Sequence, residues 1–292
     1  MQSSRKYLYN SKVVEEYNLP NGFESRGFLY ADGFFETFRC IEGRLPLFNL
    51  HHARIIASAE AYKMEVPIWL KKEDLKELLL QLYKASNLSG DARIRLTIFR
   101  DGDGRFTPTI NTATAIGSIE HIDGRGYEIN ENGIVIGLYQ DLLKTPSSIS
   151  NYKNLHSHLY VQAGNYAKKK GLGDVLILND NNQLIEAISS NIFLVLDGAL
   201  HTPKLESGPV GGVMRAAVIN LAIALGIKVY ECNLEAHELL KADEVFLTNA
   251  LHGIQWVASY RTKRYFNKTA LMLLEELNKV VLPNAYDLTT KT

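Results

Sequence analysis

The feature that most constrains the fold is a series of short strand-like segments in the second half of the chain. DVLILN (174–179), QLIEAI (183–188) and NIFLVL (191–196) are rich in aliphatic residues and are separated only by short stretches of Asp, Asn and Ser, which favour turns. Segments with a helical apolar period lie around them. We therefore predict further strands at 227–232, 244–249 and 253–259, and helices within 150–171, 207–226 and 268–281.

The first half alternates strands and helices in the same way. Aromatic and β-branched residues predict strands at 33–43, 92–100 and 112–122. Apolar residues at helical spacing predict amphipathic helices at 49–62 and 71–86. The fold class is therefore α/β, with mixed α and β elements.

A stretch rich in Gly, Asp and Asn lies between the two halves and has little periodicity. Such a composition is typical of a connection between domains. We predict a smaller N-terminal α/β domain over 1–121, a linker over 122–132 and a larger C-terminal domain over 133–292.

Composition argues against several classes of partner. The chain has 32 Lys and Arg and 32 Asp and Glu, so it lacks the basic excess typical of a nucleic-acid-binding protein. Its two cysteines, Cys40 and Cys232, are too widely separated to indicate a disulfide framework or a cysteine zinc site. No signal peptide or membrane-length apolar run is evident. We expect a cytoplasmic protein without a metal and without a nucleic-acid or membrane partner.

The glycine-rich stretch GPVGGVMR (208–215) leads into a predicted helix. Backbone N–H groups at a helix N-terminus, together with the partial positive charge there, favour an anion such as phosphate. The stretch matches neither the P-loop nor the GxGxxG pattern. It indicates either a phosphate site or a tight turn between a strand and a helix.

Lys153 differs from the other lysines of SNYKNLHSHLYVQAGNYAKKKG (150–171). The lysines at 168–170 are clustered at the predicted helix end, where solvent and the helix dipole suit cations. Lys153 instead adjoins Tyr152 and Leu155 at the start of the apolar run, where partial loss of hydration makes the neutral amine accessible. Such a lysine can form a Schiff base with an aldehyde, and a solvated surface lysine is the alternative.

Glu186 and Arg54 are the other candidates. Glu186 lies in a predicted strand between Ile185 and Ala187, where a buried carboxylate needs a cation, such as the protonated nitrogen of a pyridine ring. A half-buried strand would instead turn Glu186 to solvent. In HHAR (51–54) the adjacent histidines do not share a helix face, which argues against a metal pair and leaves Arg54 as a candidate phosphate ligand.

Each of these signals is weak alone. Together they provide a lysine for an aldehyde, a carboxylate for a ring nitrogen, a helix start for a phosphate and an arginine. Those are the groups with which a protein holds pyridoxal 5′-phosphate (PLP). The sequence therefore predicts PLP as the cofactor.

Six blocks of the sequence, in their order along the chain, resemble the class IV aminotransferases, which are the fold-type IV PLP enzymes. The blocks extend from about residue 30 to about residue 257 and read ADGFFETFR, HHARIIASAE, YKNLHSHLYVQA, LIEAISSNIFLV, GPVGGVMRAA and EVFLTNALHGI. The family includes branched-chain and D-amino-acid aminotransferases and 4-amino-4-deoxychorismate lyase. The resemblance implies two domains with the cofactor at their interface, mostly on the larger PLP-binding C-terminal domain, and a homodimer.

The resemblance also implies a role for each matching residue. Lys153 corresponds to the lysine that forms the aldimine with PLP and shuttles the proton of the substrate carbon. Glu186 corresponds to the carboxylate facing the pyridine nitrogen, and Arg54 to the phosphate-binding arginine. The other implied positions are Gly212, Val213, Met214, Asn249 and Ala250 at the cofactor, and Tyr30, Thr37, Arg39 and Arg105 at the substrate.

Three positions depart from the family pattern, and two reactions stay open. Met214 and Ala250 stand where many members have a threonine, and His156 replaces an asparagine or tyrosine.

The main hypothesis is amino transfer between an amino acid, branched-chain or D-type, and a 2-oxo acid. The alternative, favoured by Thr37, Arg105 and the block containing Ala250, is release of pyruvate from aminodeoxychorismate to give 4-aminobenzoate. A catalytically inactive phosphate-ligand binding module is a third hypothesis, against which the retention of both the lysine and the carboxylate argues.

Overall fold

The computed structural model describes residues 5–16 and 24–282 and divides the chain into two compact units. Unit 1 consists of the described residues up to Arg125 together with Tyr152–His156, and unit 2 of Gly126–Asn151 with the described residues from Ser157 onward. The boundary after Arg125 falls inside 122–132, the stretch expected as a linker. The sequence does not predict that Tyr152–His156, which includes Lys153, belongs to the first unit.

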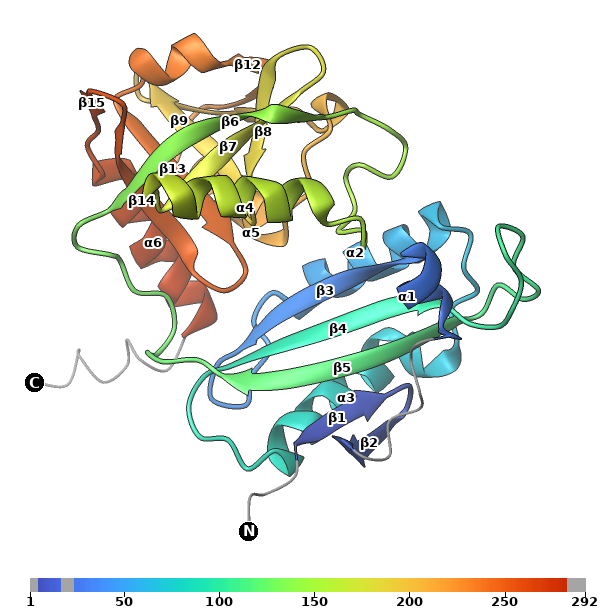
Figure 1. Cartoon of the computed structure of the whole chain (residues 1–292). Helices are drawn as coiled ribbons and strands as arrows, with labels where there is room; N and C mark the ends of the chain where they lie inside the picture. The colour runs from blue at the N-terminus through green and yellow to red at the C-terminus, as the bar shows by residue number, and fades with distance from the viewer. Residues whose placement is uncertain (1–4, 17–23, 283–292) are drawn as a thin grey trace, which may run out of the picture. The chain divides into compact units, whose positions relative to one another are not determined.

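Unit 1 is an antiparallel five-stranded sheet with the two long helices, Phe48–Ala61 and Lys72–Ala85, on one face (Figure 1). The strand order is β2-β1-β5-β4-β3. The strands are β1 (Lys6–Tyr9), β2 (Lys12–Glu15), β3 (Gly33–Cys40), β4 (Ala92–Arg100) and β5 (Ala113–His121). The helices are α1 (Arg26–Tyr30), α2 (Phe48–Ala61), η3 (Ile68–Leu70) and α3 (Lys72–Ala85).

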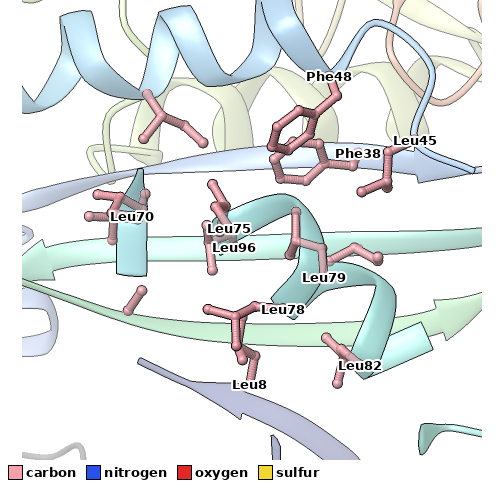
Figure 2. Close-up of a cluster of buried hydrophobic side chains, with 14 of the residues drawn as sticks. Leu8, Phe38, Leu45, Phe48, Leu70, Leu75, Leu78, Leu79, Leu82 and Leu96 are labelled. Atoms are coloured by element: carbon pink, nitrogen blue, oxygen red, sulfur yellow. The ribbon is translucent and has the colours of Figure 1, made fainter. Parts of the chain in front are cut away.

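The core of unit 1 lies between this sheet and its helices. α3 places Leu75, Leu78, Leu79 and Leu82, which are three and four residues apart, against the sheet, where they meet Leu96 of β4 (Figure 2). All of these side chains are buried, and each contributes roughly 1.5–3 kcal/mol to folding.

The sheet face opposite that core carries the residues between the core positions. Because successive side chains of a strand point to opposite faces, Phe35 and Thr37 of β3 lie on the face away from Phe34 and Phe38 of the core. Arg95 of β4 is the cross-strand neighbour of Thr37 on that second face. Phe35, Thr37 and Arg95 therefore share the sheet face opposite the core.

Unit 2 is built on a ten-stranded mixed sheet of order β11-β10-β9-β13-β14-β6-β7-β8-β12, with β15 paired to β14. α4 packs on β6 and β7, whereas α5 and α6 pack on β13 (Figure 1). The strands are β6 (Ile134–Lys144), β7 (Asp174–Asn179), β8 (Gln183–Ala187), β9 (Asn191–Leu196), β10 (Ala199–Pro203), β11 (Val229–Cys232), β12 (Leu234–Glu235), β13 (Glu244–Asn249), β14 (Gly253–Tyr260) and β15 (Lys263–Arg264). The helices are α4 (His158–Lys170), η4 (Leu205–Ser207), α5 (Val213–Ala224), η5 (Ala236–Leu240) and α6 (Lys268–Val281).

Most of the predicted elements are confirmed, but the predicted helix that would include Lys153 is wrong at its N-terminal end. β4, β7, β9, β13 and α6 have the bounds that the sequence predicts. The helix predicted within 150–171 begins only at His158, so neither Lys153 nor Leu155 belongs to it. Phe35 N instead donates to Lys153 O at 2.8 Å and Leu155 N to Gly33 O at 3.1 Å. These two bonds form an isolated antiparallel bridge between Phe34 and Asn154, which holds the segment at the edge of β3 because that edge satisfies two of its backbone groups.

Two kinds of feature, a membrane-spanning helix and a cluster of metal ligands, are absent from residues 5–16 and 24–282. None of its helices is long and apolar enough to cross a membrane. No three His, Cys, Asp or Glu side chains are grouped so that they could hold a metal ion.

Candidate active site

Lys153 is fixed at the edge of β3 through its own backbone. Phe35 N donates to the Lys153 carbonyl and Leu155 N donates to Gly33 O, so the two bonds flank Asn154 and orient the peptide group that follows Lys153. Its Nζ lies 4.6 Å from the centroid of the Phe35 ring. An aromatic face compensates a cation electrostatically while it displaces part of the cation's water. A rigid strand thus positions this amine, as covalent chemistry requires.

Arg95 is a second cation on the Phe35 ring, and sequence reasoning missed it. Its Cζ lies 3.7 Å from the ring centroid. Burial, and then the charge of Arg93, lower the pKa of Arg95, but a guanidinium stays protonated in proteins. A planar, partly dehydrated cation of this kind is suited to bind a carboxylate. The alternation in ARIRLTIFR, which places Arg93, Arg95 and Thr97 on one strand face, is the signal that could have found it.

Arg54 is bound by Glu36, a buried carboxylate of β3 that the sequence analysis did not single out. Arg54 Nε donates to Glu36 Oε2 at 2.9 Å and Nη2 to Oε1 at 2.5 Å, while His51 Nδ1 lies 3.0 Å from Oε1. Burial opposes the ionisation of Glu36, but Arg54 and His51 outweigh it and hold the pKa of Glu36 well below its usual range. Burial also lowers the pKa of His51, against the attraction of Glu36. The pair orients the Arg54 guanidinium through two of its three nitrogens, and its phosphate contact stays a prediction.

Arg39, expected at the substrate, forms a buried ion pair instead. Its Nε and Nη2 donate to Asp91 Oδ2 at 2.9 and 2.7 Å, and both residues are almost fully buried. Removing one partner from such a pair leaves an uncompensated buried charge, so the pair is a structural feature of unit 1. Asp91 lies 52 residues from Arg39 along the chain, and only the register of β3 and β4 brings the two side chains together.

Tyr30 and Arg105, both expected at the substrate, are placed by Arg26. The Arg26 guanidinium lies 5.0 Å from the Tyr30 ring, and its Nη1 donates to the carbonyls of Gly104 and Arg105 at 2.8 Å each. Its Nε also pairs with Asp32 at 2.9 Å. The Arg105 side chain itself is exposed. Arg26 therefore fixes the backbone of the loop that carries Arg105 and leaves that side chain at the surface of unit 1.

Glu186 in unit 2 is a buried carboxylate with three hydrogen-bond donors, and the alternative that it faces solvent is wrong. Its Oε1 accepts from Lys144 Nζ at 2.7 Å and from Tyr160 Oη at 2.8 Å, and its Oε2 from Val210 N at 2.8 Å. Burial, and then the charge and hydrogen bond of Glu186, raise the pKa of Tyr160 far above its usual value, so the phenol remains a donor. Lys144 supplies the cation that a buried carboxylate needs. Sequence reasoning missed Lys144 because it is 42 residues distant.

The glycine-rich loop ends at Gly212, the N-cap of α5. A Cβ at Gly212 would lie 1.8 Å from Asn191 Oδ1, so the backbone can approach this side chain only as glycine. Val213 and Met214 begin α5, and the N–H groups of a first helical turn have no partner within their own helix. The loop therefore has the close approach and the donors of an anion site.

Asn249 and Ala250 lie where β13 turns into β14. Asn249 Oδ1 accepts two backbone N–H groups of this turn at 2.9 and 2.8 Å, and Ala250 O accepts from Tyr127 Oη at 3.0 Å. Thr248, just before them, is buried, and its Oγ1 has no hydrogen-bond partner among the described residues. Thr248 is the cross-strand neighbour of Asn191, so the two share one sheet face. An acceptor on a ligand at this face would satisfy the hydroxyl, whose isolation is costly.

These residues fit the cofactor that the sequence predicts. Unit 2 carries a buried carboxylate suited to a ring nitrogen, a glycine-initiated helix start suited to a phosphate and an orphaned buried hydroxyl. Unit 1 carries an amine held by a strand edge. The donor set therefore matches a phosphorylated pyridine aldehyde.

Comparisons with known proteins agree on one family. The sequence model described as "Amino-transferase class IV" matches residues 33–260. A Methanocaldococcus jannaschii protein named "Putative branched-chain-amino-acid aminotransferase" is 32% identical over 250 residues, which cover 83% of each chain. An aminodeoxychorismate lyase of Bacillus subtilis is 27% identical over 249 residues, 83% of this chain and 82% of that one. A branched-chain aminotransferase from Thermoproteus uzoniensis, crystallised with norvaline, has the same fold, with a TM-score of 0.86 over 96% of both chains at 22% identity.

The chain belongs to the class IV aminotransferase family, whose members are PLP-dependent enzymes. The expected two-domain fold of mixed α and β elements is confirmed by the structural match. Both reactions that the sequence left open occur among the relatives, because one is named as an aminotransferase and another as a lyase.

Proposed function

We propose that this enzyme binds PLP and transfers an amino group between an amino acid, branched-chain or of D configuration, and a 2-oxo acid. The observation that carries the proposal is the pair of cations on the Phe35 ring, Lys153 at 4.6 Å and Arg95 at 3.7 Å. One is an amine for covalent chemistry, and the other is a guanidinium for the carboxylate that every amino acid and 2-oxo acid carries. The name of the Methanocaldococcus jannaschii relative supports the same reaction.

In the proposed mechanism, each residue acts at a defined atom. PLP, when bound, supplies an electron sink for the negative charge that develops at the substrate α-carbon. Lys153 would hold the cofactor's aldehyde carbon through its Nζ and would move the proton of the substrate α-carbon. Glu186, which is paired with Lys144 at 2.7 Å, would accept a hydrogen bond from a protonated ring nitrogen. The first turn of α5 would hold the phosphate, and Arg95 would bind the substrate carboxylate.

A lyase is the second candidate. Release of pyruvate from aminodeoxychorismate, with 4-aminobenzoate as the other product, is supported by the Bacillus subtilis relative. The placement of Arg105 also favours it, because Arg26 presents that exposed side chain on a fixed loop. The homodimer and the cytoplasmic location stay predictions, whichever of the two reactions the enzyme catalyses.

A single half-reaction separates the two candidates. PLP-loaded enzyme is mixed with L-leucine, L-valine or D-alanine and no 2-oxo acid, and the cofactor absorbance is followed. An aminotransferase converts the cofactor to its amine form in one turnover, and the responding amino acid identifies chain type and handedness. In a parallel sample the enzyme receives only aminodeoxychorismate. Pyruvate release there, without amine formation in the first sample, contradicts the aminotransferase assignment and supports the lyase.

A further inference from the structure

The loop before α5 is held by three side chains from different parts of unit 2. Asn151 Nδ2 donates to Leu205 O at 2.8 Å and to Pro209 O at 2.7 Å. Asn191 Nδ2 donates to Val210 O at 2.7 Å. Glu186 Oε2 accepts from Val210 N at 2.8 Å. A loop that glycine would otherwise leave conformationally free is thus tied down at successive backbone atoms.

These bonds fix two consecutive peptide planes at both of their ends. The peptide joining Pro209 to Val210 gives its carbonyl to Asn151 and its N–H to Glu186. The next peptide gives the carbonyl of Val210 to Asn191 and the N–H of Gly211 to Asn151 O, at 2.9 Å. Because a peptide unit is planar, holding its carbonyl and its N–H together sets its orientation.

Asn151 contributes more of these bonds than either other side chain. Its side-chain amide donates to two carbonyls, those of Leu205 and Pro209. Its backbone carbonyl accepts from the N–H of Gly211. Asn151 also stands two residues before Lys153 in the chain. One short segment therefore anchors the loop before α5 and leads directly into the candidate reactive lysine.

We infer that Asn151 is a positioning residue for the cofactor phosphate, an inference that rests on the proposed function in PLP chemistry. By fixing the peptides of Pro209 and Val210, it sets the direction in which the chain enters α5. That direction decides where the N–H groups of Gly212, Val213 and Met214 point. Donors that are oriented beforehand bind an anion without the entropic cost of ordering the loop.

A phosphate-positioning role and a merely structural role predict different results. If Asn151 only stabilises unit 2, its loss weakens every ligand of the enzyme alike. If it positions the phosphate donors, its loss weakens PLP but hardly affects pyridoxal, which has the same ring and aldehyde and no phosphate. The ratio of the two affinities isolates the phosphate contribution, because Lys153 can react with both compounds.

The experiment measures the Kd of PLP and of pyridoxal on the full-length apoprotein, together with the competition of inorganic phosphate against PLP. Wild type is compared with Asn151→Ala, with Asn151→Ser and with Asn181→Ala, an exposed control in the turn between β7 and β8. Two hydrogen bonds are lost in the alanine variant, so the PLP-to-pyridoxal affinity ratio should fall about 10-fold or more. Serine keeps one hydroxyl donor, so the affinity ratio of the Asn151→Ser variant should lie between those of Asn151→Ala and wild type. The control should match wild type, and phosphate should compete less well in the alanine variant.

The outcomes separate this inference from the proposed function. If wild type prefers PLP to pyridoxal and Asn151→Ala keeps the same ratio, the positioning role is wrong and the proposed function stands. If wild type itself shows no preference for the phosphorylated compound, the proposed function is wrong and the inference falls with it. Pyridoxal binding reports whether each variant is folded, and the serine variant decides the matter if the alanine variant is not.

Discussion

At the scale of single residues, the cations of the candidate site fall into two groups. Arg39, Arg54 and Lys144 each contact a buried carboxylate, whereas Arg95 and Lys153 lie on the ring of Phe35. A cation that balances a buried carboxylate is held in place by the cost of separating the pair. A cation on an aromatic face gives up less when it engages a substrate or cofactor. The ring contacts support Lys153 and Arg95 as the residues proposed for the chemistry, and the phosphate contact of Arg54 stays a prediction.

Replacing Arg95 tests its assignment to the substrate carboxylate. A hydrogen bond to a charged group contributes about 1.5–3 kcal/mol, so Arg95→Gln should raise KM for the amino acid roughly 10- to 100-fold. The Kd of PLP should not change. Arg93→Gln, on the same strand face but paired with Glu120, is the matched control and should retain wild-type KM. Equal KM effects in both variants would argue against a specific role for Arg95.

Replacing Lys144 tests whether Glu186 depends on it for its charge balance. Lys144→Met leaves a buried carboxylate without its lysine partner and should destabilise the apoprotein by about 3 kcal/mol. The loss should be smaller with PLP bound, because the protonated ring nitrogen then provides a cation for Glu186. Thermal unfolding with and without PLP measures both effects, with the exposed Lys169→Met as control. If PLP gives the variant no larger rise in Tm than it gives wild type, Glu186 is not the partner of the ring nitrogen.

At the scale of elements, local patterns predicted where strands and helices lie but not which edges they join. The bounds of β7, β9 and α6 follow from apolar period and turn residues within each segment. The segment around Lys153 also has a helical period, yet two backbone hydrogen bonds to the edge of β3, more than a hundred residues earlier, hold it outside the helix. The same limit hid Asp91, whose partner Arg39 is set by strand register, and Glu36, whose partners Arg54 and His51 lie on α2. Periodicity carries no information on such long-range pairing.

Asp174 at the start of β7 ties that strand to the end of β8 and makes stability depend on pH. Its Oδ1 accepts from Val175 N at 2.7 Å and from Ile188 N at 3.2 Å, and burial nevertheless raises the pKa of Asp174 to about 6. A pKa that is higher in the folded than in the unfolded state favours folding at low pH, and this contribution disappears as pH rises through about 6.

Asp174→Asn keeps both backbone hydrogen bonds and removes the titration. Relative to wild type, the variant should therefore gain stability between about pH 4 and pH 7, by up to about 3 kcal/mol. Tm measured across that range for both proteins checks the prediction, and the exposed Asp180→Asn serves as the control. A constant Tm difference over the whole range would mean that Asp174 does not titrate there.

At the scale of the whole molecule, the order of six sequence blocks was enough to predict the family, and the family match confirms it. Lys153 and Glu186 could be proposed because their neighbours in the sequence are distinctive. The residues that support them could not, because only tertiary contacts bring Lys144 and Tyr160 to Glu186 and, within unit 1, Arg95 to the ring that Lys153 also contacts. The choice between amino transfer and pyruvate release depends on such contacts as well, so it needs the half-reaction described above.

The central claim is that Lys153 is the residue to which PLP is attached, and borohydride reduction tests it most directly. The purified protein is loaded with PLP, reduced and digested, and the modified peptide is identified by mass spectrometry. The phosphopyridoxyl group should be found on Lys153, should persist there in Lys144→Met and should be absent from Lys153→Ala. A modified peptide that carries the group on Lys144, or an unchanged yield of adduct in Lys153→Ala, would contradict the assignment.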